Sequence, residues 1–518
     1  MKKRRGPLIA AALLIVVIAI IVAAGLFLDK YRPSTEHENL KNWFHTSGGS
    51  EAAIVVDGVV MDSLALVEGG RVYVDIDTAK DVLNDRFYYD DAEKLFIYAS
   101  SDVLYTASAG ESGYYIGNDL KSAAYPVIIE ENGQAYIEID FAKSFSAFKY
   151  ESFSEPDRVV IEIGEAEFET VTATANTELR VKGGIKSNIL TDVEKGRKLY
   201  VVEEFENWTK VFTEDGFLGF VQNKRVSEAS TEKREISSNM YEDFSHNHLN
   251  DDVVLLWHQV TNTSANRYVT SVLSQTSGVN VISPTWFYLN DSDGNIADLA
   301  SSDYVSYCHE RGVQVWALCS NLENPGADTT EVLTHTTKRQ CLVNQLVAKA
   351  LSYNLDGINI DFEALKGEVS DSFIQFIREL SIKCRANNII LSVDNYPPSA
   401  YTNFYNRKEQ NLFADYVIIM GYDEHYSGSD EGSVASIGYV ENAVKNTIAQ
   451  GVDPSNIILG MPFYTRMWEL TPKGDESDSA ESTKADYKNY TVDSEALSMA
   501  EARKRIEANG ADITWLPD

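Results

Sequence analysis

LDGINIDFE, residues 355–363, joins a short apolar stretch to two carboxylates at its end. Asp361 and Glu363 are two residues apart, so on a β-strand both side chains point to one face, about 6.5 to 7 Å apart along the chain. Phe362 is predicted to point the opposite way, into a layer of helices. Carboxylates this close repel each other, which raises the pKa of one and keeps it protonated near neutral pH. The stretch predicts a catalytic strand end, with a charged turn as the alternative.

Comparable strands and helices recur through the C-terminal half of the chain. The predicted strands are 253–260, 279–289, 313–320, 355–363, 388–396, 415–425 and 456–468. The predicted helices between them include 301–312, 337–354, 371–388 and 433–451. Strands rich in Val and Ile without polar alternation are buried on both faces, as in a parallel sheet covered by helices. Seven β/α units in series favour a (β/α)8 TIM barrel over an open doubly wound sheet.

Polar and aromatic residues follow the ends of these strands, where barrel enzymes place their active sites. Flat aromatic faces can stack on sugar rings, and carboxylates can supply acid catalysis. The strand ends therefore predict a site that processes carbohydrate. The predicted substrate-binding residues are Trp257, Trp286, Asn395 and Tyr396.

Two of these strand ends resemble motifs of glycoside hydrolase family 18. LDGINIDFE is similar to the family's strand-4 signature, and MGYDEH, residues 420–425, is similar to its Met-x-Tyr-Asp motif of strand 6. SPTWF, residues 283–287, agrees with the spore-cortex and cell-wall lytic branch. The resemblance covers residues 252–518 and implies a glycosidase that acts on N-acetylated sugars.

The resemblance also implies a role for each matching residue. Glu363 would protonate the glycosidic oxygen, and Asp361 would hold the acetamido N–H of the substrate. Tyr422 would hydrogen-bond the acetamide oxygen, and Asp423 would steady the sugar. The substrate's own N-acetyl carbonyl would attack the anomeric carbon, giving retention of configuration without an enzyme nucleophile. No cofactor or metal is expected.

The chain departs from the family pattern in two places. Asn359 stands where the family often has a third Asp, which shortens the proton relay behind Asp361, so we expect an altered pH dependence rather than loss of activity. After the seventh strand come a polar insertion at 470–491 and a helix at 494–510, without an eighth β/α unit. We therefore expect a barrel over residues 251–518 that is truncated, and Trp515 is not expected to replace the family's stacking Trp.

The implied reaction is cleavage of β-1,4 bonds beside N-acetylated sugars, in peptidoglycan or a chitin-type glycan. The alternative is a non-catalytic lectin or scaffold of the cell wall, and the presence of Glu363 weighs against it. The loop at Asp291–Asn295 looks like a calcium loop but lacks the later ligands, so a hairpin is predicted. The net charge of −33 excludes a nucleic-acid partner, because no basic stripe could displace counterions.

The N-terminus carries the basic cluster MKKRR, followed by an uncharged apolar run at 6–28. The run is long enough to span a bilayer, so residues 1–28 are predicted to be a cytoplasmic tip and a transmembrane signal anchor, with the bulk of the protein extracellular. A cleaved signal peptide is the alternative, because Ala23, Ala24 and Gly25 offer small residues. Residues 29–50 are predicted to form a juxtamembrane stalk.

Two small, mainly β domains are predicted next. Residues 51–168, with hairpin signals at Asp57-Gly58 and Asn132-Gly133, weakly resemble a copper-amine-oxidase N-terminal-like domain. A short helix is expected at 78–83. Residues 169–228 resemble a bacterial SH3-like domain on KLYVVEEFENWTKVFTEDGFLGFV (198–221), which implies contact with wall peptides. A spacer with Trp208 in its own core is the alternative.

A polar linker is predicted at 229–250, in which His246 and His248 are expected to be solvated rather than to bind metal. The four cysteines, Cys308, Cys319, Cys341 and Cys384, match no zinc spacing. Buried free thiols are expected for them, and a disulfide is the alternative in an exported protein.

Overall fold

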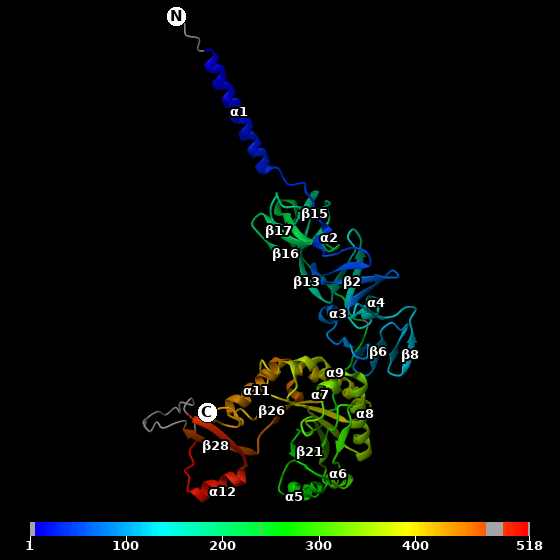
Figure 1. Ribbon diagram of the computed structural model, residues 1–518, viewed down its shortest axis with the longest axis vertical. Coiled ribbons are helices and arrows are strands. Elements are labelled where there is room, and N and C mark those ends of the chain that lie inside the picture. The colour runs from blue at the N-terminus through cyan, green and yellow to red at the C-terminus, as the bar shows by residue number, and fades with distance from the viewer. Residues whose placement is uncertain (1–5, 239, 473–489, 516–518) are drawn as a thin grey trace. The chain divides into compact units, whose positions relative to one another are not determined.

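The computed structural model describes residues 6–238, 240–472 and 490–515 (Figure 1). The chain divides into two compact units. Unit 1 comprises residues 1–89, 107–115 and 120–241, and unit 2 comprises residues 90–106, 116–119 and 242–518. The predicted candidate site falls entirely within unit 2.

Unit 2 is built on seven parallel strands that lie side by side in chain order. They are β20 (Leu255–His258), β21 (Val281–Leu289), β23 (Gln314–Ser320), β24 (Gly357–Asp361), β25 (Ile390–Asn395), β26 (Tyr416–Met420) and β27 (Ile457–Gly460). The short strand β22 (Ile296–Asp298) forms an antiparallel hairpin with β21, as predicted for the loop at Asp291–Asn295. No strand among the described residues pairs with the outer edges of β20 and β27, so the described sheet is open there.

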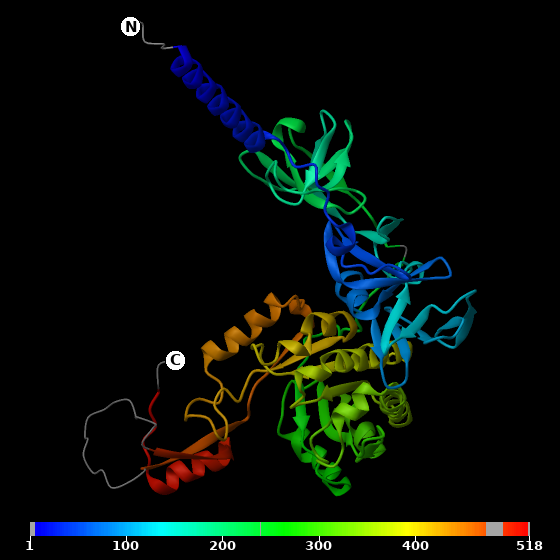
Figure 2. The same ribbon diagram turned by 45° about the horizontal axis from the view of Figure 1, so that its top comes forward.

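The seventh predicted strand is interrupted. β27 ends at Gly460, and β28 (Tyr464–Pro472) pairs instead with β29 (Tyr490–Ser498) in a separate antiparallel hairpin. Pro462 lies in the break and cannot donate to a ladder, which explains why the strand stops. The predicted helix at 494–510 begins later, as α12 (Met499–Asn509), and Figure 2 shows it with the hairpin in red. Of the predicted polar insertion, residues 473–489 lie outside the described residues.

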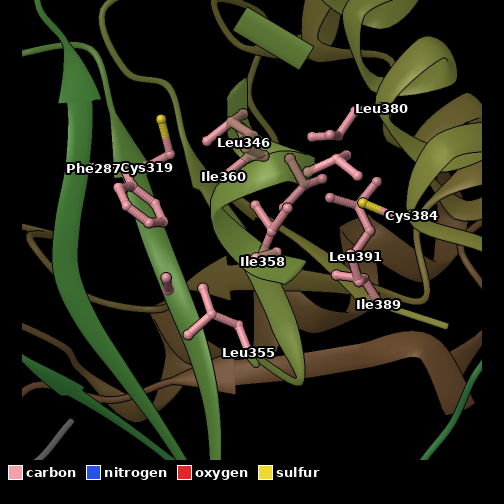
Figure 3. Packing of buried hydrophobic residues seen from close by; sticks show 14 of the residues in the cluster. Phe287, Cys319, Leu346, Leu355, Ile358, Ile360, Leu380, Cys384, Ile389 and Leu391 are labelled. Carbon is pink, nitrogen blue, oxygen red and sulfur yellow. The ribbon is translucent and has the colours of Figure 1, made fainter. Parts of the chain in front are cut away.

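Helices connect the strands and bury the outer face of the sheet. They are α5 (Val269–Ser274), α6 (Ser302–His309), α7 (Thr329–Thr334), α8 (Thr336–Tyr353), α9 (Ser370–Ala386), α10 (Arg407–Phe413) and α11 (Ile437–Ala449). Ile358 and Ile360 from β24 and Leu391 from β25 pack against Leu346 of α8 and Leu380 of α9 (Figure 3). Because these strand residues alternate with polar ones, the apolar half of each strand faces the helices and the polar half faces the other way.

All four cysteines are free thiols, and three of them, Cys308, Cys319 and Cys384, are buried. Figure 3 shows Cys319 and Cys384 within the apolar packing. The expectation of free thiols is therefore confirmed in the structure. Burial raises the pKa of Cys308 to about 12, which keeps it as a neutral thiol.

The boundary between the predicted β domain and the C-terminal domain differs from the sequence interpretation. Residues 90–106 belong to unit 2, although they were predicted within 51–168. Asp90 Oδ2 accepts hydrogen bonds from the backbone nitrogen and Oγ1 of Thr336, both at 2.6 Å, at the start of α8. This side chain satisfies a helix N-terminus that would otherwise be left with free N–H groups.

At the end of the predicted linker, His246 is half-buried rather than solvated, whereas His248 is exposed as predicted. The rings of His246 and His248 stack at 5.3 Å, and Asn247 N donates to Asp415 Oδ1 at 2.6 Å, just before β26. Burial lowers the pKa of His246, so its neutral form is favoured. The described residues contain no group of three or more His, Cys, Asp or Glu side chains placed to hold a metal.

Unit 1 contains two seven-stranded sheets. The first has the order β11 (Phe148–Phe153), β12 (Arg158–Ile163), β1 (Glu51–Val56), β2 (Val59–Glu68), β3 (Arg71–Asp75), β10 (Gln134–Glu138) and β9 (Ile128–Glu131). The predicted turns at Asp57-Gly58 and Asn132-Gly133 join β1 to β2 and β9 to β10, and all four residues have positive φ. The predicted short helix is α3 (Ile76–Val82).

The second sheet has the order β15 (Ile189–Val193), β14 (Thr177–Arg180), β18 (Leu218–Gln222), β17 (Trp208–Phe212), β16 (Lys198–Glu204), β13 (Ala166–Thr172) and β19 (Ser230–Arg234). β19 lies in the predicted linker but pairs with β13, so the linker begins later than expected. A five-stranded sheet of β4 (Tyr88–Asp90), β5 (Leu95–Ala99), β6 (Leu104–Ser108), β7 (Gly113–Ile116) and β8 (Asp119–Ser122) completes the β structure.

The segment predicted as a stalk packs against the second sheet of unit 1. Glu38 N donates to Ile189 O at 2.8 Å, and Phe44, after the short helix α2 (Leu40–Trp43), is fully buried in an apolar cluster with Phe217. The apolar ring of Phe44 makes burial favourable and holds this otherwise polar segment to the domain.

The apolar run near the N-terminus lies in helix α1 (Gly6–Tyr31). Within the part of the chain that the structure describes, no helix meets the length and apolarity required to cross a membrane.

Candidate active site

The end of β24 divides its side chains between two faces, as predicted. Phe362 is buried among the helices, and its ring stacks on Phe376 of α9 at 5.4 Å. Asn359 and Asp361 alternate with it and face the other way, toward the ends of the neighbouring strands. The strand therefore places the Asp361 carboxylate on the face of the sheet that the helices do not cover.

The pKa of the Asp361 carboxyl is shifted far from its ordinary value. Burial, followed by the charges of Glu363 and Glu323, raises the pKa of Asp361 to about 7. Its Oδ1 is buried and has no hydrogen-bond partner among the described residues. The sequence predicted that repulsion between the two carboxylates raises the pKa of one of them. In the structure the larger cause is the loss of solvent on burial, and repulsion comes second.

Glu363 is held through its backbone. Its N–H donates to Asn321 Oδ1 at 2.8 Å, and Asn321 Nδ2 donates to the Glu363 carbonyl oxygen at 3.0 Å. The next residue, Ala364, has φ of +53°, and its N–H donates to Tyr396 Oη at 3.3 Å. The chain thus turns sharply after Glu363, while the two Asn321 hydrogen bonds fix where that turn begins.

Tyr396, predicted as a substrate-binding residue, borders Glu363 in the structure. Burial raises the pKa of Tyr396, and a hydrogen bond with the Glu363 carboxylate raises it further. The phenol therefore stays protonated and is placed to donate to Glu363.

Asn359 lies at the centre of a buried hydrogen-bond network and is fully buried itself. Its Oδ1 accepts from Trp257 Nε1 at 3.0 Å and from Ser283 Oγ at 3.1 Å. Its Nδ2 donates to Asp394 Oδ1 at 2.8 Å. One amide thus links β20, β21 and β25 to the strand that carries Asp361.

Tyr422 and Trp257 form the aromatic side of the site. Their rings meet edge to face at 6.5 Å. Burial raises the pKa of Tyr422, as do the nearby charges of Asp394, Asp361 and Glu363, so this phenol also remains a donor. A cavity of about 500 Å³, which Trp257 and Tyr422 help to line, opens between β20 and β27.

Gly460 makes room for this aromatic pair at the end of β27. A Cβ there would lie 3.0 Å from Trp257 Cη2 and 3.2 Å from Tyr422 Cε1. Both distances are shorter than ordinary carbon contacts, so only glycine lets both rings keep these positions.

Asp423 is anchored by the hairpin that follows the sheet. Tyr464 Oη donates to Asp423 Oδ1 at 2.6 Å, and Arg466 Nη2 lies 3.5 Å from the same oxygen. Asp423 has φ of +56°, a left-handed conformation that Asp tolerates better than most residues. The site is therefore completed by β28, which the sequence did not connect with it.

Two predicted substrate-binding residues do not face the site. Trp286 is fully buried, and its Nε1 donates to Asn266 Oδ1 at 2.8 Å. The pairing of β21 with β23 shifts register between Thr285 and Phe287, and this bulge redirects Trp286 into the helix layer. Asn395 is also fully buried, where its Nδ2 donates to Gln410 Oε1 at 2.8 Å.

Asn395 and Tyr396 are adjacent in the sequence. Because successive side chains of a strand point to opposite faces, only one of the two can face the site. Alternation alone would have favoured Asp394 over Asn395. Asn321, Tyr464 and Arg466 carry no comparable local signal, because their roles depend on contacts with distant segments.

The strand ends bring carboxylates and aromatic rings together on one face of the sheet, which is a combination suited to handling sugars. Residues 323–518 match the model of glycosyl hydrolases family 18, so this part of the chain is a glycoside hydrolase family 18 domain.

Part of the chain is similar to proteins from Bacillus subtilis and from other organisms. The uncharacterized glycosylase YvbX of Bacillus subtilis is 26% identical over 191 residues, which cover 35% of this chain and 55% of that protein. The cortical fragment-lytic enzyme of Bacillus subtilis is 23% identical over 230 residues, covering 41% of this chain and 53% of that enzyme. The chain thus spans about half the length of these relatives.

Solved structures are also similar to part of this chain. The chitinase from Chromobacterium violaceum ATCC 12472 is 21% identical, with a TM-score of 0.42 over 51% of this chain and 78% of that one.

Proposed function

We propose that unit 2 is a glycosidase that hydrolyses β-1,4 bonds beside N-acetylated sugars in peptidoglycan or a chitin-type glycan. The observation that carries the proposal is the placement of Glu363 two residues after Asp361, the last residue of a buried strand, whose pKa burial raises to about 7. The match of residues 323–518 to family 18 supports the same reaction class. So do relatives named for cortical fragments and for chitin.

In the reaction we propose, Glu363 gives its proton to the glycosidic oxygen as the bond to the anomeric carbon breaks. The carbonyl oxygen of the substrate's own N-acetyl group attacks that carbon and forms an oxazolinium ion. Asp361 accepts the acetamido N–H and balances the positive charge. Glu363, now a carboxylate, takes a proton from water as the water oxygen attacks the anomeric carbon. The bond from that carbon to the acetamide oxygen breaks and the N-acetyl group re-forms, so configuration is retained.

Aromatic and polar neighbours orient the sugar in this proposal. Tyr422 remains protonated and donates to the acetamide oxygen, which draws the carbonyl toward the anomeric carbon. Asp423, held by Tyr464 and Arg466, accepts from a sugar hydroxyl. Trp257 offers its ring face beside the acetamide, and Tyr396 steadies Glu363.

The test uses the full chain on purified peptidoglycan and on chitin oligomers, with reducing ends as the measurement. Glu363→Gln keeps the shape but cannot donate the proton, so we expect a loss of roughly 10²- to 10⁴-fold in kcat. Glu368→Gln, on the exposed turn after the site, is the matched control and should keep wild-type activity. Equal release by wild type and Glu363→Gln, or none by wild type on either glycan, would refute the proposal.

The stereochemistry is a separate test. If the substrate's acetamide is the nucleophile, the first product seen by proton NMR carries the β-anomer of the new reducing end. An α-anomer as the first product would contradict substrate-assisted retention, even if hydrolysis is confirmed.

We also propose that residues 6–28 anchor the protein in the cell membrane, with the N-terminus in the cytoplasm and the rest outside. What supports this is the basic cluster MKKRR before an uncharged run, which favours that orientation. The full chain should remain with carbonate-washed membranes, whereas a chain lacking residues 1–28 should be released. Release of both would reject the anchor.

For the second sheet of unit 1, we propose contact with wall peptides. What supports it is the resemblance of residues 198–221 to an SH3-like domain and the half-buried Trp208, which is outside the apolar cluster of this sheet. Trp208→Ala in the full chain should weaken co-sedimentation with purified cell walls. Unchanged sedimentation would favour a spacer.

A further inference from the structure

Asp394 lies on β25, the strand next to the one that carries Asp361. The two strands are parallel, with Ile360 opposite Val393. Continuing this register by one residue places Asp361 opposite Asp394. Residues opposite each other in a parallel pair point to the same face, so both carboxyls share the face that the helices leave free.

Asn359 determines which oxygen of the Asp394 carboxyl accepts a hydrogen bond and which one can carry a proton. An indole nitrogen can only donate, so the Asn359 oxygen must face Trp257 Nε1, 3.0 Å away, and the amide nitrogen must face Asp394. That nitrogen donates to Asp394 Oδ1 at 2.8 Å. Asp394 Oδ1 is therefore an acceptor, and any proton that Asp394 carries must be on Oδ2.

The surroundings of Asp394 favour its neutral form. The residue is only 3% exposed. Burial raises the pKa of Asp394 well above its usual range, and the charges of Asp361 and Glu363 raise it further, against the opposing effect of the Asn359 hydrogen bond. The other titratable groups that face this pair are also acids: Glu323 after β23 and Tyr422 after β26.

We propose that Asp394 is the positioning residue of the site: a neutral carboxylic acid whose Oδ2–H donates to the Asp361 carboxylate. The inference rests on the proposed glycosidase function and adds a carboxyl from outside the family's strand-4 motif. Asp361 needs such a donor, because its Oδ1 is buried without a hydrogen-bond partner among the described residues.

A neutral donor at this place serves the reaction better than a second anion. It stabilises Asp361 as the anion that faces the oxazolinium ion, whereas a charged Asp394 would oppose ionisation of Asp361. The proton stays on Asp394 through both steps, so the carboxyl pair carries one negative charge while Asp361 balances the cation. The structure thus replaces the acid that Asn359 cannot provide with one from the adjacent strand.

The experiment follows Asp361 by carbon NMR in the full chain labelled with ¹³C at the Asp carboxyls. Wild type, Asp394→Leu and Asp394→Asn are titrated, with Ser392→Ala as a control on the same strand and face. We expect the Asp394 signal of wild type to stay protonated at pH 7. Asp394→Leu removes the donor and should raise the pKa of Asp361 by about one to two units.

Asp394→Asn keeps a neutral donor in the same position, so it should shift the pKa of Asp361 by less than half as much. The acid limb of the pH profile of kcat should move by the same amount in each variant, and Ser392→Ala should leave both unchanged. A purely structural role for Asp394 would lower kcat equally at every pH.

Three results would overturn the inference: an ionised Asp394 in wild type at pH 7, a fall in the pKa of Asp361 in Asp394→Asn, or no change in Asp394→Leu. If the Leu variant does not fold, the wild-type signal and the Asn variant still decide. If the NMR titrations give the expected pKa changes but wild type cleaves no glycan, the glycosidase proposal fails and the donor role of Asp394 stands. If wild type cleaves glycan but the expected pKa changes of Asp361 are missing, only the inference about Asp394 fails.

Discussion

Unit 2 buries charged groups in two regions. In one region the buried charges are paired and hydrogen-bonded, and in the other the pKa of the buried carboxyl is raised. In the helix layer, Arg339 and Glu379 are both fully buried and form an ion pair at 2.9 Å. Gln340 and Gln375 donate to the same carboxylate at 2.6 and 3.0 Å. At the strand ends, burial and neighbouring carboxylates raise the pKa of Asp361 instead.

The difference separates structural charges from those available for chemistry. A buried ion pair with saturated hydrogen bonds holds helices in register and has no capacity left for a ligand. A buried carboxyl with a free oxygen is costly to the fold and is retained where a reaction needs it. Breaking each region should therefore have opposite effects on stability.

The largest effect is expected in the helix layer. Glu379→Ala leaves Arg339 as an uncompensated buried cation, so the free energy of unfolding should fall by about 3–5 kcal/mol. Urea denaturation followed by circular dichroism measures it. Glu441→Ala breaks the exposed pair with Lys445, 2.7 Å long, and should change the free energy of unfolding far less, because solvent screens the pair. Equal costs for the two variants would contradict the comparison.

At the strand end the effect should reverse and depend on pH. The folded pKa of Asp361 is about 7, above the value of about 3.9 for an unfolded Asp, so the folded state binds more protons between these values. Its contribution to the free energy of unfolding should therefore decrease by about 1–3 kcal/mol as pH rises from 4 to 7, then level off.

Asp361→Asn should remove that decrease, so the difference from wild type grows in favour of the variant up to pH 7. Urea denaturation at pH 4.5, 6 and 7.5 checks it, with Glu368→Gln as an exposed control. A difference that does not vary with pH would show that Asp361 ionises as easily as in the unfolded chain.

A smaller effect is expected from the donor that orients Asn359. Trp257→Phe removes the indole N–H but leaves the Ser283 hydrogen bond, so the loss of stability should be about 0.5–1.5 kcal/mol. Trp316→Phe removes a comparable hydrogen bond, 2.9 Å from Trp316 Nε1 to Gln314 Oε1, outside the site. Only the Trp257 variant should also alter the pH profile of kcat. Identical pH profiles for the two variants would show that Trp257 does not influence the carboxyls of the site.

The smallest effect concerns the turn after Glu363. Ala364 has φ of +53°, which disfavours any side chain, so Ala364→Gly should raise the free energy of unfolding by up to about 1 kcal/mol. Thermal denaturation measures it, with Ala350→Gly in the last turn of α8 as a control that should destabilise. A loss of stability at both positions would show that the turn is not strained.

Local patterns in the sequence carried much of the fold. The apolar runs predicted all seven parallel strands, and helical periodicity predicted α6, α8, α9 and α11. The Gly-containing turns at Asp57 and Asn132 predicted two hairpins of unit 1. Where the pattern failed, at Pro462 and at Trp286, a break or a bulge overrode the expected continuation of a strand.

The candidate site was predicted only in part. The two-residue spacing of Asp361 and Glu363 predicted a common face for them, and Tyr422 and Trp257 follow strand ends as expected. Asn395 was misplaced, because the alternation of β25 turns it into the helix layer.

The sequence by itself determined which residues of one strand share a face, because side-chain alternation is a local property of the backbone. Only the tertiary structure decided that Asp394 stands beside Asp361, that Asn321 holds Glu363, and that β28 secures Asp423. Those relations depend on the register between segments separated by 30 or more residues, which no local pattern encodes. The physical reason is that pairing register is set by packing of the whole sheet against its helices.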